Sequence, residues 1–221
     1  MLKRKLKALF SKGLRPHFSQ TGEDVLIRPY LRAIKAGHYL DLGAYDPYVL
    51  SNTAILWTEG WSGCNVDANF SSIKKFEKNR PQDVNVFGSI VTDEERRDGK
   101  NEVVFFIDGD DAGNQSATGS IIASNKVQSE TKVPCYSIHE ILDKCDFKKL
   151  DYLNIDLEGY DLKIISDFPF ERFSPSVITI EDHQISVIQA SESPIAKVLF
   201  SKGYDFVART YMTSVFVRNP D

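Results

Sequence analysis

The sequence predicts an α/β fold, doubly wound and Rossmann-like, with a mostly parallel sheet of seven strands. Two observations lead to this prediction. Short apolar runs typical of strands alternate with helical patterns along most of the chain, which indicates successive strand–helix–strand units. The last two runs leave no room for a helix between them, so we expect them to pair as an antiparallel hairpin.

The expected elements can be placed in order along the chain. Strand-like runs occur at 38–42, 63–67, 84–90, 102–107, 150–156 and 176–181, and the hairpin at 204–209 and 213–218. Helical patterns occur at 23–36, where Gly37 is the expected stop, and at 70–78, 138–144, 162–166 and 193–201. A parallel sheet that ends in an antiparallel hairpin is typical of the class I methyltransferase variant of this fold, which we therefore expect.

One long stretch, residues 108–130, shows no periodic apolar pattern and is rich in Asp, Gly, Ser and Thr. Irregular stretches of this length inside a compact domain are usually functional or mobile. We therefore expect it to cover part of a binding site.

The chain of 221 residues is long enough for one α/β domain, which we place at 18–221, after an N-terminal extension at 1–17. The first 15 residues carry six basic side chains and no acidic ones, with apolar residues near helical spacing. We expect a basic amphipathic helix that either contacts an anionic membrane or a partner, or is simply a solvated or docked helix. The remainder carries 21 basic and 31 acidic residues, and this acidic body argues against nucleic acid as a partner.

The sequence also carries signals for location. No apolar run approaches the ~20 residues that span a bilayer, and no apolar segment typical of a secretory signal follows the basic start. Cys64, Cys135 and Cys145 are widely spaced, and we expect free thiols, the first two buried in strands. These features predict a cytoplasmic protein, and the basic extension leaves open a peripheral location at the inner face of the membrane.

The first candidate binding motif is the strand end YLDLGAYD at 39–46. Gly43 stands where the first strand turns toward a helix, at the sheet edge where open α/β sheets bind ligands. The segment lacks the G-x-G-x-x-G pattern that brings a backbone close to a pyrophosphate. One close approach at Gly43 suits a ligand without phosphate, such as S-adenosylmethionine, whose cationic methionyl end Asp41 or Asp46 would face. An ordinary strand-to-turn junction is the alternative interpretation.

Two further strand ends extend this candidate nucleoside site. Asp67 ends the second strand, and a carboxylate there can accept hydrogen bonds from both ribose hydroxyls. A helix cap or a solvated turn is the alternative for Asp67. Gly88 and Ser89 end the third strand, where small and polar groups suit the edge of an adenine, although an ordinary turn is equally compatible with them.

Acidic residues gather at the ends of the next two strands. Asp156 and Glu158 alternate with apolar residues and are expected to share one face, whereas Glu181, Asp182 and His183 follow the neighbouring strand. Methyl transfer to a hydroxyl needs in-line positioning and a proton acceptor, which a carboxylate or His183 would provide. Alternatively, a Mg²⁺ or Mn²⁺ ion held by Asp156, Glu181 or Asp182 and His183 would acidify the hydroxyl. Helix caps, a satisfied turn and a structural histidine are the other interpretations.

Taken together and in order, these motifs resemble those of the FkbM-type methyltransferases. The resembling segments lie between about 18 and 218: FSQTGED at 18–24, GHYLDLGAYDP at 37–47, SNT at 51–53, GWSG at 60–63, RP at 80–81, DLEG at 156–159 and ITIE at 178–181. Their combination is far more specific than any one segment. The chain departs from the family at Asp67-Ala68, where Glu-Pro is common, and at Asp161, where Glu is common.

The resemblance implies S-adenosylmethionine as methyl donor and an oxygen of a small molecule or glycan as acceptor. It also implies a place near the cofactor for the segment 18–24, which composition alone would assign to a helix cap and solvated charges. The expected cofactor-binding residues are Ser19, Gln20, Glu23, Asp24, Asp41, Gly43, Ala44, Asp46, Ser51, Asn52, Thr53, Asp67, Ser89 and Asp156. The expected catalytic residues are Asp156, Glu158, Glu181 and His183.

The sequence thus predicts an S-adenosylmethionine-dependent O-methyltransferase that acts on a sugar hydroxyl of a glycan, a surface polysaccharide or a glycosylated metabolite. An NAD-dependent oxidoreductase on a similar sheet is a second hypothesis, against which the missing G-x-G-x-x-G pattern counts. A non-catalytic glycan-binding or assembly protein is a third. A nucleic-acid methyltransferase is disfavoured by the acidic body and by the lack of an Asn/Asp-Pro-Pro-Tyr-type motif.

Overall fold

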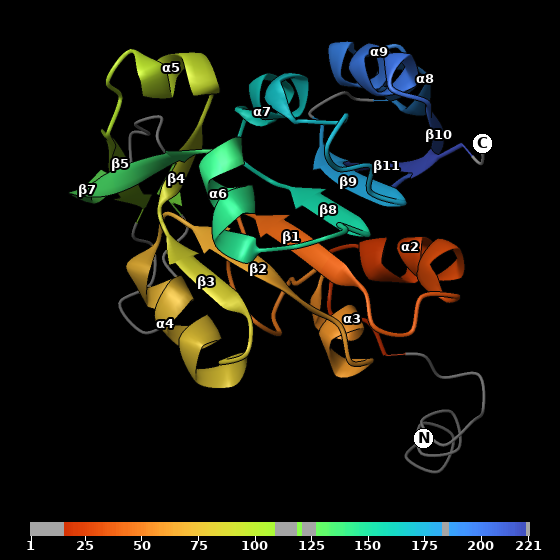
Figure 1. Cartoon of the computed structure of the whole chain (residues 1–221), viewed down its shortest axis with the longest axis horizontal. Helices are drawn as coiled ribbons and strands as arrows, with labels where there is room; N and C mark the ends of the chain where they lie inside the picture. The colour runs from red at the N-terminus through yellow and green to blue at the C-terminus, as the bar shows by residue number, and fades with distance from the viewer. Residues whose placement is uncertain (1–15, 109–118, 121–126, 183–185, 220–221) are drawn as a thin grey trace, which may run out of the picture.

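The computed structural model describes residues 16–108, 119–120, 127–182 and 186–219. The described residues form two sheets, with helices packed around the larger one (Figure 1). The basic helix expected at 1–15, much of the irregular stretch expected at 108–130, and His183 lie outside the described residues. The division at residue 17 between an extension and a domain therefore stays a prediction.

The larger sheet contains seven strands in the order β10-β11-β9-β8-β1-β2-β3. Their bounds are β1 His38–Leu42, β2 Ser62–Asp67, β3 Val84–Phe87, β8 Tyr152–Ile155, β9 Val177–Glu181, β10 Tyr204–Arg209 and β11 Thr213–Arg218. Neighbours from β9 to β3 are parallel, whereas β11 runs antiparallel to both β9 and β10. This is the Rossmann-like methyltransferase fold, so the predicted fold class and its C-terminal hairpin are confirmed.

Helices cover both faces of this sheet. The helices of the described residues are α2 Glu23–Leu31, α3 Ala54–Thr58, α4 Phe70–Asn79, α5 Asp93–Arg97, α6 Ile138–Cys145, α7 Asp161–Asp167, α8 Val187–Ser191 and α9 Pro194–Ser201, of which α5 contacts the smaller sheet instead. In Figure 1, α7, α8 and α9 lie on one side of the strands and α2, α3 and α4 on the other. Alternation along β1 produces these two layers: Leu40 and Leu42 pack with residues of α6, α7 and α9, and Tyr39 packs with residues of α2 and α3.

A smaller sheet stands beside the β3 edge, with strand order β4-β7-β5-β6. Its strands are β4 Ser89–Val91, β5 Glu102–Asp108, β6 Gly119–Ser120 and β7 Val127–Ser137. Gly88 divides the strand predicted at 84–90 into β3 and β4, and a Cβ at this position would collide with the ring of Tyr136. The chain therefore leaves the larger sheet at Gly88, and β4 pairs in parallel with β7.

Three sequence expectations were wrong in detail. The helix predicted at 23–36 ends at Leu31, and Gly37 is needed instead for close packing, because a Cβ there would collide with the ring of Trp61. Part of the stretch predicted to be irregular belongs to β6 and β7, which pair with the distant strand β5 and leave no local periodic signal. Helices α3, α5 and α8 were not predicted, because five residues are too few to show helical periodicity.

The cysteines agree with the sequence prediction. Cys64 on β2 and Cys135 on β7 are buried free thiols, and Cys145 at the end of α6 is also free and buried. Within the part of the chain that the structure describes, every helix is too short or too polar to cross a bilayer.

Candidate functional site

A cavity of ≈ 230 Å³ opens at the carboxyl ends of β1, β2 and β8. This is the edge at which doubly wound sheets bind ligands. Its walls are the loops that follow these strands, together with the start of the smaller sheet. Of the site residues predicted from sequence, those that line it are Gln20, Asp41, Gly43, Ala44, Asn52, Asp67, Ser89, Asp156 and Glu158.

The turn after β1 is fixed by Gly43. Its backbone N–H donates to the carbonyl of Val66 on β2 at 2.9 Å, and its φ of 82° lies in the left-handed region that favours glycine. A Cβ at this position would overlap the backbone oxygen of Asp156. The sequence predicted that a ligand approaches Gly43 closely, whereas in the structure the group that approaches it is the backbone at the end of β8. Gly43 therefore brings the loop after β1 next to the acidic residues that follow β8.

The floor of the cavity is a hydrogen-bonded polar network. Asp41 is buried and accepts hydrogen bonds from Thr53 Oγ1 at 2.7 Å and from Asn154 Nδ2 at 2.8 Å. Burial raises the pKa of Asp41, and these two hydrogen bonds oppose that increase. Asn52 donates to Asn154 Oδ1 at 2.9 Å, while its own Oδ1 is a buried acceptor without a hydrogen-bond partner among the described residues.

Asp67 lies at the end of β2 and lines another part of the cavity. Its carboxylate accepts hydrogen bonds from the backbone N–H groups of Tyr45 at 2.8 Å and Asn69 at 2.6 Å. Burial raises the pKa of Asp67 to about 6, although the two backbone hydrogen bonds act against the shift. Ser89, at the start of β4, also lines the cavity, and its assignment to the adenine edge stays a prediction.

Asp156 and Glu181 form a carboxyl pair at the ends of the adjacent strands β8 and β9. Glu181 is buried, and the two carboxyl groups hydrogen-bond each other. Burial, with the charges of neighbouring carboxylates, raises the pKa of Asp156 to about 8 and that of Glu181 to about 7. The pair therefore binds protons more tightly than two isolated carboxyl groups would.

Glu158 and Asp161 lie in the turn between β8 and α7. Asp161 is buried and accepts hydrogen bonds from the backbone N–H groups of Leu157 and Gly159, each at 3.0 Å. We predicted that Asp156 and Glu158 share one face through the alternation of a strand. Strand β8 ends before both residues and Glu158 has a left-handed φ of 51°, so the turn and not strand alternation determines its position. It reaches the cavity because Asp161 holds the turn.

Several predicted cofactor residues support the cavity without lining it. Asp24 accepts hydrogen bonds from Phe18 N and Ser19 Oγ, both at 2.7 Å, and Glu23 accepts one from Thr210 Oγ1 at 2.6 Å. These contacts fix residues 18–24, which we call the N-terminal strap, so that Gln20 reaches the cavity. Glu23 and Asp24 are thus buried structural carboxylates and not solvated charges.

The loop after Gly43 contains the remaining supporting residues. Asp46 accepts hydrogen bonds from the backbone N–H of Tyr48 at 3.0 Å and from Lys75 Nζ at 2.8 Å. Ser51 and Thr53 are buried and hydrogen-bond to other protein groups. Their assignment to direct cofactor binding stays a prediction.

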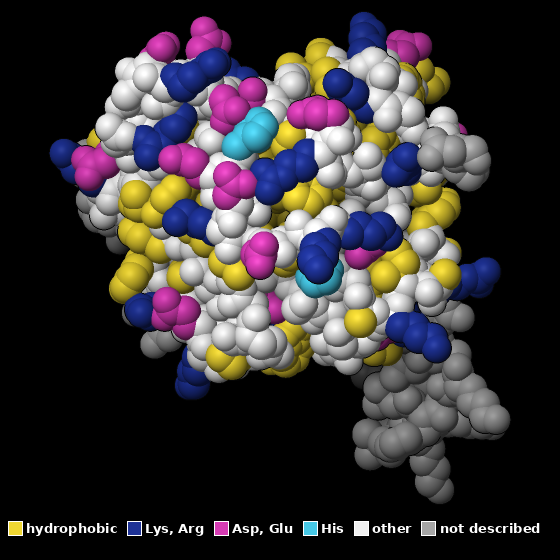
Figure 2. Space-filling model, viewed as in Figure 1, with side chains coloured by type: hydrophobic (Ala, Val, Ile, Leu, Met, Phe, Trp, Pro, Cys, Tyr) yellow, Lys and Arg dark blue, Asp and Glu magenta, His cyan; other side chains and the backbone are white. Residues whose placement is uncertain are grey.

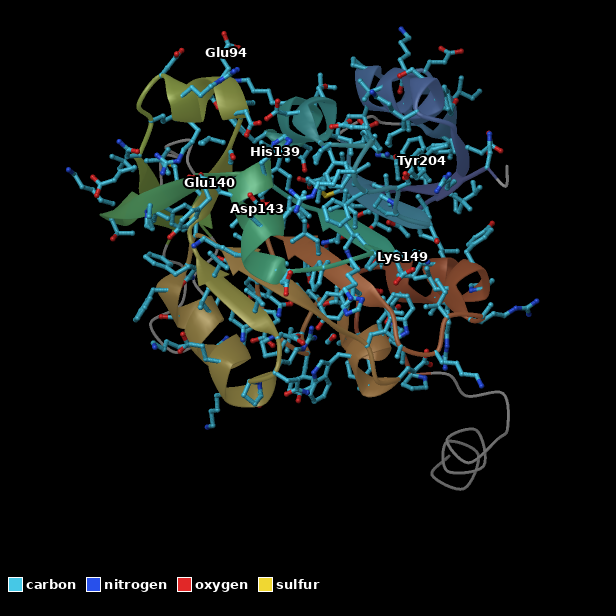
Figure 3. The ribbon with its side chains drawn as sticks, in the orientation of Figure 1. Glu94, His139, Glu140, Asp143, Lys149 and Tyr204 are labelled. Atoms are coloured by element: carbon cyan, nitrogen blue, oxygen red, sulfur yellow. The ribbon has the colours of Figure 1, made fainter. Side chains whose placement is uncertain are left out.

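A metal site receives no support from the described residues, which contain no group of three His, Cys, Asp or Glu side chains arranged to hold an ion. His183, one of the predicted ligands, lies outside them. A second acidic and basic cluster, on α6, is structural: Glu140 and Asp143 form ion pairs with Arg96 and Arg172 at 2.8 and 2.6 Å, and His139 Nδ1 lies 2.6 Å from Asp93 Oδ2 (Figure 3). Among the described residues that line the cavity, the acidic ones are therefore Asp41, Asp67, Asp156 and Glu158.

Sequence reasoning missed several cavity residues. Asn154 is a polar residue in the middle of the buried strand β8, and that contrast is a signal that could have identified it. The apolar and aromatic ones gave no signal, because such side chains look the same in sequence whether they line a cavity or cover a core. They include Tyr45, Leu50, Phe105, Leu157 and Tyr160.

The fold and this ordered set of polar strand ends define a Rossmann-like methyltransferase. The sequence model of the methyltransferase FkbM domain matches residues 41–206. The chain therefore belongs to the FkbM methyltransferase family.

Two solved structures are similar to this chain over most of its length. A TehB-like S-adenosylmethionine-dependent methyltransferase from Corynebacterium glutamicum shares 12% identity at a TM-score of 0.44, covering 99% of this chain and 96% of that one. A precorrin-6y C5,15-methyltransferase from Geobacter metallireducens shares 11% identity at a TM-score of 0.42, covering 87% and 84%. No curated protein sequence matches the chain.

Proposed function

We propose that the protein transfers a methyl group from S-adenosylmethionine to a hydroxyl oxygen of a sugar, in a glycan, a surface polysaccharide or a glycosylated metabolite. The observation that carries this proposal is the pair of adjacent carboxyl groups Asp156 and Glu181, of which Asp156 lines the cavity in the methyltransferase fold. It offers a proton acceptor beside a nucleoside-type site.

The residues present fit the proposed cofactor. Asn52 Oδ1 is a buried acceptor without a partner among the residues that the structure describes, which suits an ammonium donor at the methionyl end. Asp67 retains acceptor capacity for ribose hydroxyls beyond its two backbone hydrogen bonds. When bound, S-adenosylmethionine supplies an electrophilic methyl group on a sulfonium ion.

The acidic pair would act on the acceptor. Near neutral pH one carboxyl group of Asp156–Glu181 is ionised and the other is protonated, so the ionised group accepts the proton that the hydroxyl loses. The turn held by Asp161 presents Glu158 at the same cavity, where it would orient sugar hydroxyls. The pair needs no metal ion for this role.

The charge of the site supports a small neutral acceptor. Asp156, Glu158 and Glu181 would repel the phosphates of a nucleic acid. On the face shown in Figure 2, Lys and Arg side chains are interspersed with Asp and Glu and do not gather into a basic surface. We therefore propose a sugar or glycan acceptor and no nucleic-acid partner.

The first experiment tests cofactor class by thermal unfolding with S-adenosylhomocysteine, NAD or NADP. S-adenosylhomocysteine at about 100 times its Kd should stabilise the folded chain by about 2.7 kcal/mol, and the nicotinamide cofactors should not. Stabilisation by NAD alone would overturn the proposal in favour of an oxidoreductase.

The second experiment tests catalysis. Radiolabelled methyl transfer should be measured against neutral mono- and oligosaccharides and glycosylated metabolites. Glu181→Gln should lower kcat by about 10²–10⁴-fold while cofactor binding is retained. Cofactor binding by the wild-type chain without any S-adenosylhomocysteine production across this panel would favour a non-catalytic glycan-assembly protein instead.

A further inference from the structure

Arg80 is a fully buried cation that contacts one wall of the cavity from behind. It follows α4 directly, is 0% exposed, and forms no direct ion pair among the described residues. Burying an unpaired guanidinium is costly unless its donors are satisfied. Such a residue therefore calls for an explanation beyond packing.

The guanidinium joins two parts of the molecule. On one side, Nη1 donates to the hydroxyl of Tyr39 in β1 at 3.1 Å. On the other side, it holds the loop after β1: Nη1 donates to Thr53 Oγ1 at 2.9 Å, and Nη2 donates to Ser51 Oγ at 3.2 Å and to the carbonyl of Pro47. One planar group thus fixes residues 47, 51 and 53 relative to the sheet.

This loop forms the cavity wall. Tyr45 and Leu50 both line the cavity and both have left-handed φ angles, 57° and 55°. Such conformations cost free energy in residues other than glycine and persist only where neighbouring contacts enforce them. The contacts from Arg80 to Pro47 and Ser51 lie beside these strained positions, and Asn52, with its unpartnered Oδ1, follows Ser51.

Arg80 also reaches the cavity floor through one hydroxyl. Thr53 Oγ1 accepts from Arg80 and donates to Asp41 Oδ2, which lines the cavity. On the opposite side the Tyr39 hydroxyl donates to Asp83. The charge of Arg80 is thus balanced by two carboxylates, each one hydroxyl away, and the rings of Trp57 and Phe76 exclude water around it.

We infer that Arg80 is a positioning residue for the cofactor: its guanidinium fork holds the strained loop 45–53 in the conformation that binds S-adenosylmethionine. This inference rests on the proposed function and goes beyond it, because Arg80 does not line the cavity and reaches the cofactor only through the loop. Arg80 therefore affects the affinity for the cofactor through the loop, in addition to its effect on the stability of the fold.

The two sides of Arg80 provide the test. Thr53→Val removes the loop-side partner, whereas Tyr39→Phe removes the sheet-side partner, and each deletes one buried hydroxyl that bonds to the same guanidinium and to a carboxylate. Affinity for S-adenosylhomocysteine is measured by calorimetry on the full chain, and stability is measured by urea unfolding without ligand. Neither measurement depends on knowing the acceptor.

We expect Thr53→Val to weaken S-adenosylhomocysteine binding at least tenfold and Tyr39→Phe to change it less than threefold, with comparable losses of stability. Arg80→Lys keeps the charge but loses the fork, so it should bind at least tenfold more weakly if it folds. Equal affinity losses in Thr53→Val and Tyr39→Phe, or a folded Arg80→Lys with wild-type affinity, would overturn the inference. If the wild-type chain itself fails to bind, the proposed function fails instead, so the two failures are distinguishable.

Discussion

At the scale of single residues, Gly43 is the position with the least tolerance. Its backbone N–H hydrogen-bonds to β2, and its α-carbon lies against the end of β8. This residue, which directly follows β1, therefore contacts both strands that neighbour β1. Glycines in cofactor-binding turns are usually explained by the tight turn itself or by the close approach of the ligand. In this protein the approach of Asp156 already requires glycine.

Gly43→Ala is therefore predicted to lower the free energy of unfolding by about 2–5 kcal/mol, because the new Cβ overlaps the Asp156 carbonyl and φ is left-handed. Urea unfolding followed by circular dichroism measures this loss. Gly99→Ala is the matched control, since Gly99 has a similar φ of 92° but open space around its α-carbon. It should cost only about 1–2 kcal/mol. Equal losses at both positions would contradict the collision.

The sequence predicted individual site residues best where a local feature, such as the end of a parallel strand, determines which residue type is needed. Asp41, Gly43 and Asp67 were recognisable because the ends of parallel strands meet at one edge. The roles of Ser51 and Thr53 were not recognisable, because they depend on Arg80, a residue about 30 positions away in sequence. A buried arginine has no local sequence signature.

At the scale of elements, the turn from β8 to α7 shows how a residue at the start of a helix can determine the shape of a neighbouring cavity. Asp161 begins α7 and uses both carboxylate oxygens to hold the N–H groups of Leu157 and Gly159. That conformation places Glu158 in the cavity wall. A group that caps a helix thus also sets the shape of the acceptor side.

Replacing Asp161 should separate these effects. Asp161→Asn keeps one acceptor oxygen and should cost about 1 kcal/mol of stability, whereas Asp161→Ala loses both and should cost about 2 kcal/mol. Both should reduce kcat, because Glu158 and Asp156 flank the distorted turn. Ser193→Ala, which removes the cap of α9, should cost about 1 kcal/mol and leave kcat unchanged. A normal kcat in Asp161→Ala would show that the turn does not position the site.

Elements were predictable from sequence in proportion to their length and regularity. The hairpin strands β10 and β11 occur at the predicted residues, and α4 and α6 agree to within one residue. Helix α8 escaped prediction because five residues are too few to show helical periodicity, and strand β6 because its two residues are held by pairing with β5. The division at Gly88 also escaped it, since the collision with Tyr136 depends on a residue of the other sheet.

At the scale of the whole molecule, the acidic cavity makes stability depend on pH. The folded chain holds protons on Asp156 and Glu181 up to about pH 7–8, whereas the unfolded chain loses them near pH 4. Between these values the native state binds more protons than the unfolded state, so stability falls as pH rises. The loss of stability that ionising the buried carboxyl pair causes is therefore complete only above pH 8.

Glu181→Gln should therefore gain stability relative to the wild-type chain as pH rises from 5 to 9, by on the order of 2 kcal/mol. Urea unfolding at several pH values measures the difference. A difference between Glu181→Gln and the wild-type chain that stays constant with pH would show that the pair does not share a proton.

The contact between Thr210 and Glu23 has a consequence for the order in which the protein is made. The N-terminal strap is synthesised first, but the hydroxyl that anchors its Glu23 belongs to the turn of the last hairpin. Strand β11 must also insert between β9 and β10 before that turn is in place. A chain truncated before β10 therefore lacks the hydroxyl that anchors Glu23, and its N-terminal strap is left with contacts within residues 18–24 and with the bridge of Ser19 to Leu50.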